Sequence, residues 1–352
     1  MDRMDRNEYR SALLKHYRDA LVQPVSDEVN RLAMLDFCGH YEKREPWRVG
    51  PFRIVPEMTF CKKTEWRDPY EIGWRSGFLF NPSLIEKDGD LYLFYRAAPR
   101  KETLCSRIGL AIYREGKGWE DFPGNPVIYP TEENELLSVE DPKVYRIGER
   151  FVMFYNGIFS PTDGEKKRYC ADPRMTVGVD MMCAVSEDLI HWEKTGTVVP
   201  RGITGLWVKA AVIPRDEHGN AVKIGGDYLM FLSEGCRGRQ MVGYSADLLR
   251  WDFEERTYLD TSSIGRLYEV ACVAAPTDSD ELCMDFFCDK NGHYAAGQAR
   301  FLRSDPFHQI QVEEGGSLSW GGVLKRNGKW ITMQGWDAKN GDNELYFYES
   351  VL

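Results

Sequence analysis

The first pattern in the chain is helical. Over residues 5–36, apolar and aromatic side chains recur at spacings of three and four, the period of an amphipathic helix: Tyr9, Leu13, Leu14, Tyr17 and Leu21. Pro24 interrupts this pattern, and Ser26 begins a second helical segment that runs to Leu35. These helices either pack on the rest of the protein or mediate homo-oligomerisation, and the sequence leaves both open.

From about residue 74 the pattern changes to short apolar strands separated by Gly, Asp and Asn turns. Five segments repeat one design, in which an apolar strand follows a polar turn; they start at residues 90, 150, 227, 281 and 329. Another short strand precedes each of them: NPSLI, EDPKVY, VKAAVIP, EVACVAAP and, in the fifth unit, SWGGVLK.

Two units also end with the same phrase, S-x-D-L-x-x-W, at residues 186–192 and 245–251, and residues 303–307 form a weaker copy. The intervals between the repeated strands suit four-stranded blades with loops of variable length. We therefore predict an all-β fold, a five-bladed β-propeller catalytic domain at residues 46–352 after an N-terminal helical extension at residues 1–45. An open β-sandwich is the alternative, but a sandwich does not repeat a closing phrase.

Composition narrows the function without identifying it. The net charge is −10 and no basic stripe is present, which argues against nucleic acid as a partner. The polar N-terminus lacks the apolar core of a secretory signal, and no segment reaches the ~18 apolar residues of a membrane span. We therefore expect a cytoplasmic protein with no membrane partner, unless a signal peptide has been removed. The nine cysteines show no zinc-site spacing and are expected to be free thiols.

Candidate chemistry comes from the propeller itself, because the innermost strand of every blade lines a central channel. Polar residues stand near the starts of these strands, and Asp337 follows the last unit: Asn81, Glu140, Asp141, Lys209, Glu269 and Asp337. Any one of them alone is explained equally well as a turn cap. Glu140 and Asp141 are adjacent and count as one position, so the residues occupy five equivalent positions. Together these positions indicate a shared site, because buried charge is costly unless it is paired or used. The sequence contains no G-x-S-x-G elbow, H-E-x-x-H motif or P-loop that would compete.

These phrases, in this order, resemble glycoside hydrolase family 130, the β-mannoside phosphorylases and β-mannosidases. The similar phrases are FNPSLI, YRAA, SRIGLAIY, PVIYP with VEDPKVY, S-x-D-L-x-x-W, VKAAVIP and GWDAKNGDNEL, and they cover about residues 74–348. The resemblance implies a five-bladed propeller, no metal or organic cofactor, and an inverting mechanism with Asp141 as general acid. It also implies a lysine on the nucleophile side of the pocket, Lys209, and a sugar site lined by Asn81, Arg96, Arg107 and Asp337.

Two departures from the family pattern bear on the reaction. The acid motif reads E-D-P-K, with Lys143 in place of the usual arginine. On the strand after Lys209 the phosphorylases carry a His-Arg pair that holds phosphate, whereas this chain reads FLSEG and has Glu234 nearby. A carboxylate repels phosphate and is suited to activating water. We therefore predict an inverting hydrolase acting on β-mannosides or related manno-oligosaccharides.

An inverting hydrolase needs a protonated acid and a base across the sugar, with carboxyl groups roughly 6.5–9.5 Å apart. Glu234 and Glu269, from consecutive blades, are the candidates for the base, and the sequence does not choose between them. Asp141 must hold its proton near neutrality, and we expect the adjacent Glu140 and burial to raise its pKa.

Other functions remain open, each with an oligosaccharide as partner. A phosphorylase would use inorganic phosphate to release mannose 1-phosphate, with an anion site formed by Lys209 and loop arginines among Arg168, Arg174, Arg237 and Arg239. A non-catalytic sugar-binding propeller is a second alternative, although the complete acid motif argues against it. A furanosidase of another five-bladed family is disfavoured, because those enzymes carry an Asp where this chain has Asn81.

Overall fold

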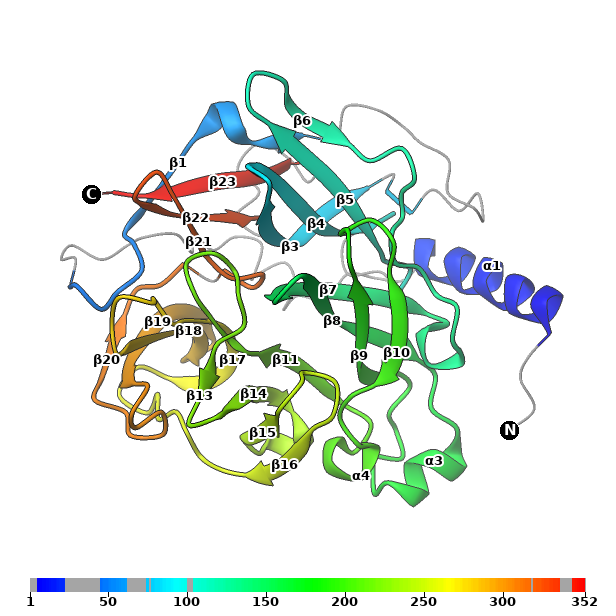
Figure 1. Ribbon diagram of the computed structural model, residues 1–352. Helices are drawn as coiled ribbons and strands as arrows, with labels where there is room; N and C mark the ends of the chain where they lie inside the picture. Colours follow the sequence, from blue (N-terminus) through cyan, green and yellow to red (C-terminus); the bar gives the residue numbers. More distant parts are fainter. Residues whose placement is uncertain are drawn as a thin grey trace.

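The structure is a computed structural model that describes residues 5–22, 45–61, 74–75, 77–99, 104–317, 319–335 and 344–351. Five antiparallel sheets surround a common axis (Figure 1). The predicted five-bladed β-propeller is therefore confirmed, and the β-sandwich alternative is wrong. The repeated strands begin where the sequence pattern placed them, at residues 90, 150, 227, 281 and 329.

The first two blades each use four strands in chain order. Blade 1 contains β3 (Phe78–Lys87), β4 (Asp90–Ala98), β5 (Arg107–Arg114) and β6 (Gly118–Asp121). Blade 2 contains β7 (Ser138–Ile147), β8 (Arg150–Phe159), β9 (Gly178–Ser186) and β10 (Glu193–Thr197).

The next two blades add short accessory strands to the same plan. Blade 3 contains β11 (Val208–Val212), β14 (Asp227–Gly235), β15 (Met241–Ser245) and β16 (Asp252–Glu255), with β13 (Lys223–Ile224) on β14. Blade 4 contains β17 (Arg266–Ala274), β18 (Glu281–Lys290), β19 (His293–Leu302) and β20 (Gln311–Glu314), and β12 (Pro214–Arg215) runs parallel to β17.

Blade 5 combines two short strands that precede blade 1 with the last three strands of the described chain. It contains β21 (Leu324–Arg326), β22 (Lys329–Gln334), β23 (Glu344–Ser350) and, from before blade 1, β1 (Phe52–Ile54) and β2 (Phe60–Cys61). Both early strands pair antiparallel with β23, and Phe52 lies opposite Ser350. This pairing closes the ring, and no sequence pattern had indicated it.

The apolar core is divided into one large cluster at each of the five interfaces between blades. The cluster between blades 1 and 2 includes Phe94 and Val139, and the one between blades 3 and 4 includes Phe231 and Val270. Three further clusters join blades 2 and 3, blades 4 and 5, and blades 5 and 1. Because each sheet packs on both faces, its strands read as nearly continuous apolar runs rather than as alternating ones.

The repeated phrase S-x-D-L-x-x-W builds the turn between the third and fourth strands of a blade. In blade 2 the Ser186 hydroxyl accepts a hydrogen bond from the backbone N–H of Leu189 (2.9 Å), which has a φ of 71°. Asp188 Oδ1 accepts from the next two N–H groups, and Trp192 Nε1 donates back to the Leu189 carbonyl. Residues 245–251 form the same set of bonds in blade 3.

The aromatic ring that ends this turn packs edge-on against the second strand of the preceding blade, and we call this contact a joint. The ring centroids are 5.5, 6.1 and 6.4 Å apart in the three joints, Trp192–Phe94, Trp251–Phe154 and Phe307–Phe231. In the weaker copy of the phrase at residues 303–307, Phe307 therefore makes this contact in place of a tryptophan.

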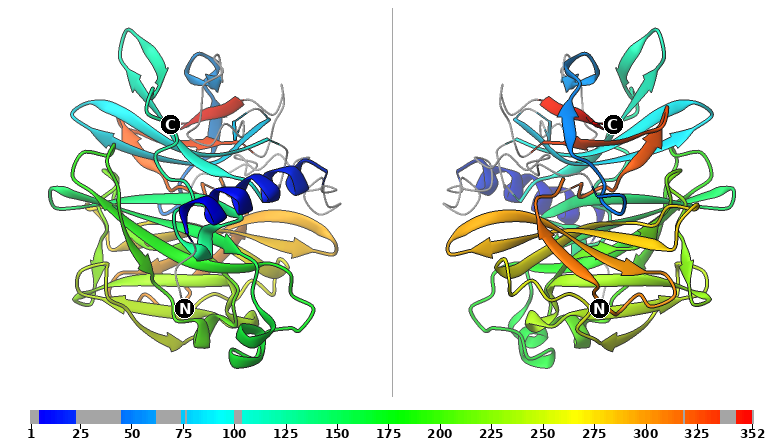
Figure 2. Two further views of the ribbon diagram at one scale, coloured as in Figure 1. Left: turned by 90° about the vertical axis from the view of Figure 1, so that its right-hand side faces the viewer. Right: turned by 90° about the vertical axis from the view of Figure 1, so that its left-hand side faces the viewer.

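The N-terminal helix α1 (Arg6–Val22) is confirmed, and the predicted second segment at residues 26–35 lies outside the described residues. Helix α1 lies outside the ring, in front of the blades in one view of Figure 2 and behind them in the other. Leu14 packs on the cluster between blades 5 and 1, and the Tyr9 hydroxyl donates to the Glu132 carbonyl (3.3 Å). In the part of the chain described, no helix has the length and apolar character needed to cross a membrane.

The remaining helical turns are short and were not predicted: η1 (Pro56–Met58), η2 (Glu133–Glu135), α3 (Asp163–Arg168), α4 (Arg201–Thr204) and η3 (Cys236–Gly238). The cysteines of the described residues are free thiols and most of them are buried, as expected.

Candidate active site

The inner strands change direction at the predicted site residues. Asn81 and Asp141 have φ values of 47° and 53°, and the register of each strand shifts at this point. Asn and Asp tolerate this left-handed conformation better than other residues with a side chain, and a bulge redirects a side chain out of the sheet. Ala210, in the inner strand of blade 3, has a similar φ of 54°. The backbone conformation of the FNPS and EDPK sequences therefore directs the side chains of Asn81 and Asp141 toward the axis of the propeller.

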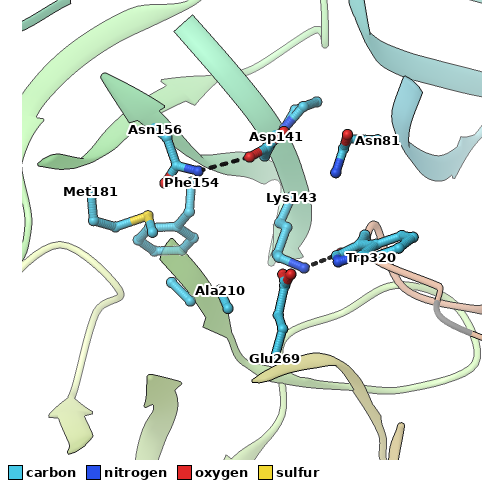
Figure 3. Close-up of a pocket in the computed structure, with 11 residues that line it drawn as sticks. Asn81, Asp141, Lys143, Phe154, Asn156, Met181, Ala210, Glu269 and Trp320 are labelled. Carbon is cyan, nitrogen blue, oxygen red and sulfur yellow. Dashed lines mark hydrogen bonds between the residues drawn. The ribbon is translucent and has the colours of Figure 1, made fainter. Parts of the chain in front are cut away.

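A narrow pocket lies where the inner strands converge (Figure 3). Blades 1 to 4 and the segment that leads into blade 5 contribute to its lining: Asn81, Asp141, Pro142, Lys143, Phe154, Asn156, Met181, Ala210, Ala211, Glu269 and Trp320. Three of the predicted site residues, Asn81, Asp141 and Glu269, thus line one pocket.

Three side chains contact the carboxylate of Asp141: one from blade 1, one from blade 3 and one from its own blade 2. Arg96 Nη1 is 3.1 Å from Oδ1, and Lys209 Nζ is 3.3 Å from Oδ2. Asn156 Nδ2 also donates to Oδ2 at 3.1 Å. Burial alone would raise the pKa of Asp141, but Lys209 and Arg96 outweigh it and lower the pKa to about 2. The predicted increase is therefore wrong for the free protein, because two cations from neighbouring blades stabilise the carboxylate.

Glu140 contacts the same two cations from the opposite side. Its Oε1 lies 2.8 Å from Arg96 Nη2 and its Oε2 lies 3.1 Å from Lys209 Nζ. The Ser138 hydroxyl donates to Oε1 (3.0 Å), and the Arg96 Nε donates to the Ser106 hydroxyl (2.8 Å). Glu140 is therefore a buried counter-ion that positions Arg96 and Lys209, and it does not line the pocket.

The two glutamates proposed as bases differ from Asp141 in their electrostatics. Glu234 stands opposite Lys209 in the pairing of β11 with β14. Burial raises the pKa of Glu234 to about 8, Glu269 adds to this rise, and Lys209 opposes it. Burial likewise raises the pKa of Glu269 to about 7, and Lys143 opposes this rise most strongly. Near neutral pH the proton of this cluster is therefore held by the glutamates and not by Asp141.

Sequence reasoning missed Asn156, Lys143 and Trp320 as site residues. Asn156 occupies the place in FYNG that Arg96 occupies in FYRA, and this alignment of the two strands was the available signal. Lys143 had been noted only as a departure from a motif. Its Nζ donates to the backbone carbonyls of Ala271 (2.9 Å) and of Trp320, which comes from the SWGG segment of the last unit.

Five of the predicted residues that the structure describes are not part of the pocket lining: Arg96, Arg107, Glu140, Lys209 and Glu234. Arg107 is buried on β5, where its Nη1 donates to the Ser106 carbonyl (2.8 Å), and it is not part of the pocket lining. Asp337 lies outside the described residues.

The arginines considered for a phosphate site are also engaged elsewhere. Arg174 pairs with Asp172 (2.8 Å), and Arg239 pairs with Glu255 (3.2 Å). The other two contact Tyr169, Arg237 through the backbone carbonyl and Arg168 through the ring. None of the four lines the pocket. Within the described ranges, no group of three or more His, Cys, Asp or Glu is arranged to hold a metal ion.

Comparison with known proteins identifies the family and supports the fold. A family model described as β-1,4-mannooligosaccharide phosphorylase, glycoside hydrolase family 130, matches residues 55–257. A curated relative, the 1,2-β-oligomannan phosphorylase of Thermoanaerobacter sp. (strain X514), is 28% identical over 131 residues. That match spans 36% of this chain and 40% of the relative, so less than half of either protein is aligned.

Solved structures resemble the chain over most of its length. A glycosyl hydrolase from Bacteroides ovatus is 19% identical with a TM-score of 0.65, covering 87% of this chain and 95% of that one. The same coverage and identity, with a TM-score of 0.64, relate the chain to a structure reported with family members that hydrolyse β-1,2 mannosidic linkages in Candida mannan. At this identity, the likeness establishes the fold alone.

Proposed function

Because the chain belongs to glycoside hydrolase family 130, we propose that it is an inverting glycoside hydrolase that cleaves β-mannosides or related manno-oligosaccharides with water. Asp141 is the general acid, and a glutamate on the opposite side of the pocket is the base. Asn81 and Asn156 line the same pocket and supply amide groups that hydrogen-bond to sugar hydroxyls.

The observation that carries this proposal is the charge balance around the pocket. Among the described residues, four carboxyl groups face three cations; the carboxyl groups are Glu140, Asp141, Glu234 and Glu269, and the cations are Arg96, Lys143 and Lys209. Each cation therefore already faces a carboxyl group. A phosphate dianion requires several cations and donors that are not already neutralised. Water requires only a carboxylate within hydrogen-bonding reach.

The location of the proton places a condition on this mechanism. In the free protein Asp141 is a carboxylate, while the pKa values of Glu269 and Glu234 are raised to about 7 and about 8. Sugar hydroxyls that bind over Asp141 compete for Arg96 and Lys209, and they also exclude water. Both effects weaken the stabilisation of the carboxylate and raise its pKa, so we infer that Asp141 acquires its proton when the substrate binds.

Product analysis in the presence and absence of inorganic phosphate tests the proposal. We expect a β-1,2- or β-1,4-linked manno-oligosaccharide to release free mannose at a rate that does not depend on phosphate. Proton NMR of the first product formed should show the α-anomer, because inversion at a β-mannoside gives α-mannose.

Phosphorolysis is the second candidate, because the relative named above is a phosphorylase. It would replace hydrolysis if mannose 1-phosphate appeared at a rate that rises and saturates with phosphate. A non-catalytic protein would bind the oligosaccharide without releasing mannose or mannose 1-phosphate. Neither the unmodified protein nor Asp141→Asn would then form product.

A further inference from the structure

Lys143 reaches across the axis of the propeller. It lies in β7 of blade 2, two positions after Asp141, and is only 6% exposed. Its ammonium group donates to the carbonyl of Ala271 in blade 4 and to that of Trp320 in the segment that leads into blade 5. One side chain of the pocket lining therefore connects blade 2 with blade 4 and with the segment that leads into blade 5.

A buried ammonium group also needs a counter-charge, because two carbonyl dipoles do not neutralise it. The titratable groups that face Lys143 are Glu269 and Cys272 of β17, Asp141 of β7 and Arg215 of β12. Burial lowers the pKa of Lys143, and Glu269 is the strongest of the groups that oppose this effect. Figure 3 shows the ammonium of Lys143 and the carboxyl group of Glu269 pointing toward one another.

Among the described residues, Glu234 faces no cation that it does not share with other carboxyl groups, although the Trp207 side chain hydrogen-bonds to it. The cation that it faces is Lys209, which is already 3.1 Å from Glu140 and 3.3 Å from Asp141. Asp141, in turn, is neutralised by Arg96 as well as by Lys209. The positive charge of Lys143 is therefore directed mainly at Glu269.

We propose that Lys143 is a positioning residue that holds Glu269 in its carboxylate form, so that Glu269 and not Glu234 is the base that activates water. This inference rests on the proposed hydrolysis. Glu269 accepts a proton from water while the water oxygen bonds to the anomeric carbon. The glycosidic C–O bond breaks, and its oxygen takes the proton of Asp141. Glu234 keeps its own proton and donates a hydrogen bond.

The first test needs no substrate. Protein labelled with ¹³C at the glutamate carboxyl carbons is titrated by NMR, and the two signals are assigned from their loss in Glu269→Gln and Glu234→Gln. We expect Lys143→Met to raise the titration midpoint of Glu269 by about one pH unit or more. The midpoint of Glu234 should move less. Lys143→Arg keeps the charge and should keep the midpoint of Glu269 close to that of the unmodified protein.

Lys209→Met is the matched control, because it removes the lysine that stands opposite Glu234. It should move Glu234 more than Glu269. The proposal is overturned if Lys143→Met leaves Glu269 unchanged, or if either lysine variant moves both glutamates equally. Lys143→Gln, which keeps an N–H donor for the carbonyls, replaces Lys143→Met if that variant does not fold.

Kinetics then separate this inference from the proposed function. With a β-mannoside as substrate, Lys143→Met should shift the acidic limb of the kcat/KM profile upward, as the Glu269 midpoint shifts. A lysine that only anchors the blades would lower the rate without moving that limb, which would contradict the proposal. If the unmodified protein cleaves no β-mannoside, the proposed function fails, while the NMR titration still decides the role of Lys143.

Discussion

The joints between blades and the pocket at the axis are built on the same strands in opposite ways. In the joints one solution is repeated, an aromatic ring from one blade against a phenylalanine of the preceding blade's second strand. Around the pocket, equivalent positions of the first and second strands carry different chemistry in each of blades 1 to 4. These opposed pairs are Phe80–Arg96, Glu140–Asn156, Lys209–Glu234 and Glu269–Phe287.

This difference separates stability from reactivity within one repeated scaffold. The joints are apolar, so their contribution to stability depends little on pH. The pocket concentrates like charges and left-handed backbone, which lower stability and make proton transfer possible. Substitutions in a joint should therefore change the free energy of unfolding and leave catalytic activity unchanged. Substitutions in the pocket should mainly change activity.

Asp141→Asn should have the largest effect on activity. The amide cannot donate a proton to the leaving oxygen, so we expect kcat on manno-oligosaccharides to fall by ~10²–10⁴-fold. Arg96 and Lys209 keep Glu140 as counter-ion, so thermal unfolding should still show a cooperative, folded protein. An aryl β-mannoside with a good leaving group needs less protonation and should lose less rate. Equal, unchanged rates on both substrates would make Asp141 a structural residue.

Trp251→Ala should have the largest effect on stability. Loss of the ring that packs on Phe154 should reduce the free energy of unfolding by about 3–5 kcal/mol, measured by urea denaturation. The exposed Leu249 of the same turn provides the control, since Leu249→Ala should change it by no more than about 0.5 kcal/mol. Activity per folded molecule should stay the same in both variants. A large fall in kcat of folded Trp251→Ala would break the separation between joint and pocket.

The pH dependence of kcat/KM should be a narrow bell. The proposed base must be ionised, and the pKa of Glu269 is raised to about 7, so activity should fall as pH decreases through this value. The proposed mechanism also keeps a proton on Glu234, and the pKa of Glu234 is raised to about 8. Activity should therefore fall again above that value. Because the groups are coupled, both limbs belong to the cluster as a whole. A broad plateau from acidic pH to about pH 7 would contradict this picture.

Glu234→Gln should stabilise the protein in a pH-dependent way. The folded protein holds the Glu234 proton up to a pKa of about 8, whereas the unfolded chain releases it near the ordinary value of 4.5. The folded state therefore binds more protons in this window, and its stability falls as pH rises through it. Gln removes this loss. The variant should unfold at a higher temperature than the unmodified protein at about pH 9, with a smaller difference at about pH 5. A gain that is equal at both pH values would contradict the burial of an ionisable carboxyl group.

Ala210→Gly should have the smallest effect. Alanine at a φ of 54° is strained, and glycine adopts this conformation without cost from a side chain. Part of the gain is lost because glycine is more flexible in the unfolded chain, so we expect stabilisation of roughly 0.5–1 kcal/mol. Denaturant unfolding of the single variant measures it. Destabilisation would mean that the methyl group packs usefully in the pocket that it lines.

The sequence was most informative where the structure depends on local chemistry. The second strand of each blade follows a polar turn, and the phrase at residues 186–192 specifies its own hydrogen bonds within one turn. The bulges at Asn81 and Asp141 are likewise local, and they explain why these residues line the pocket. Blade number and three of the pocket-lining residues, Asn81, Asp141 and Glu269, followed from such signals.

The parts that could not be predicted depend on partners far apart in the chain. The pKa of Asp141 is set by Arg96 from blade 1 and Lys209 from blade 3, and their positions relative to it emerge only when the ring closes. The contact of Lys143 with the Trp320 carbonyl joins residues 177 positions apart. The position of Arg107 on β5, beside the Ser106 carbonyl, also depends on the packing of neighbouring blades and not on its own sequence context.

The closure of blade 5 by β1 has a consequence for how the molecule comes apart. In a linear stack of repeats the terminal unit has a single neighbour, so the array can unravel from its ends. Here Arg53 bonds to Glu349, 296 positions further along the chain, so no blade is terminal. Losing any one of the five interfaces converts the ring into an open stack but leaves every blade held by a neighbour. The closed ring therefore keeps every blade packed against a neighbour when one interface opens. Its formation requires two segments that are distant in the chain to come together before the last interface can form.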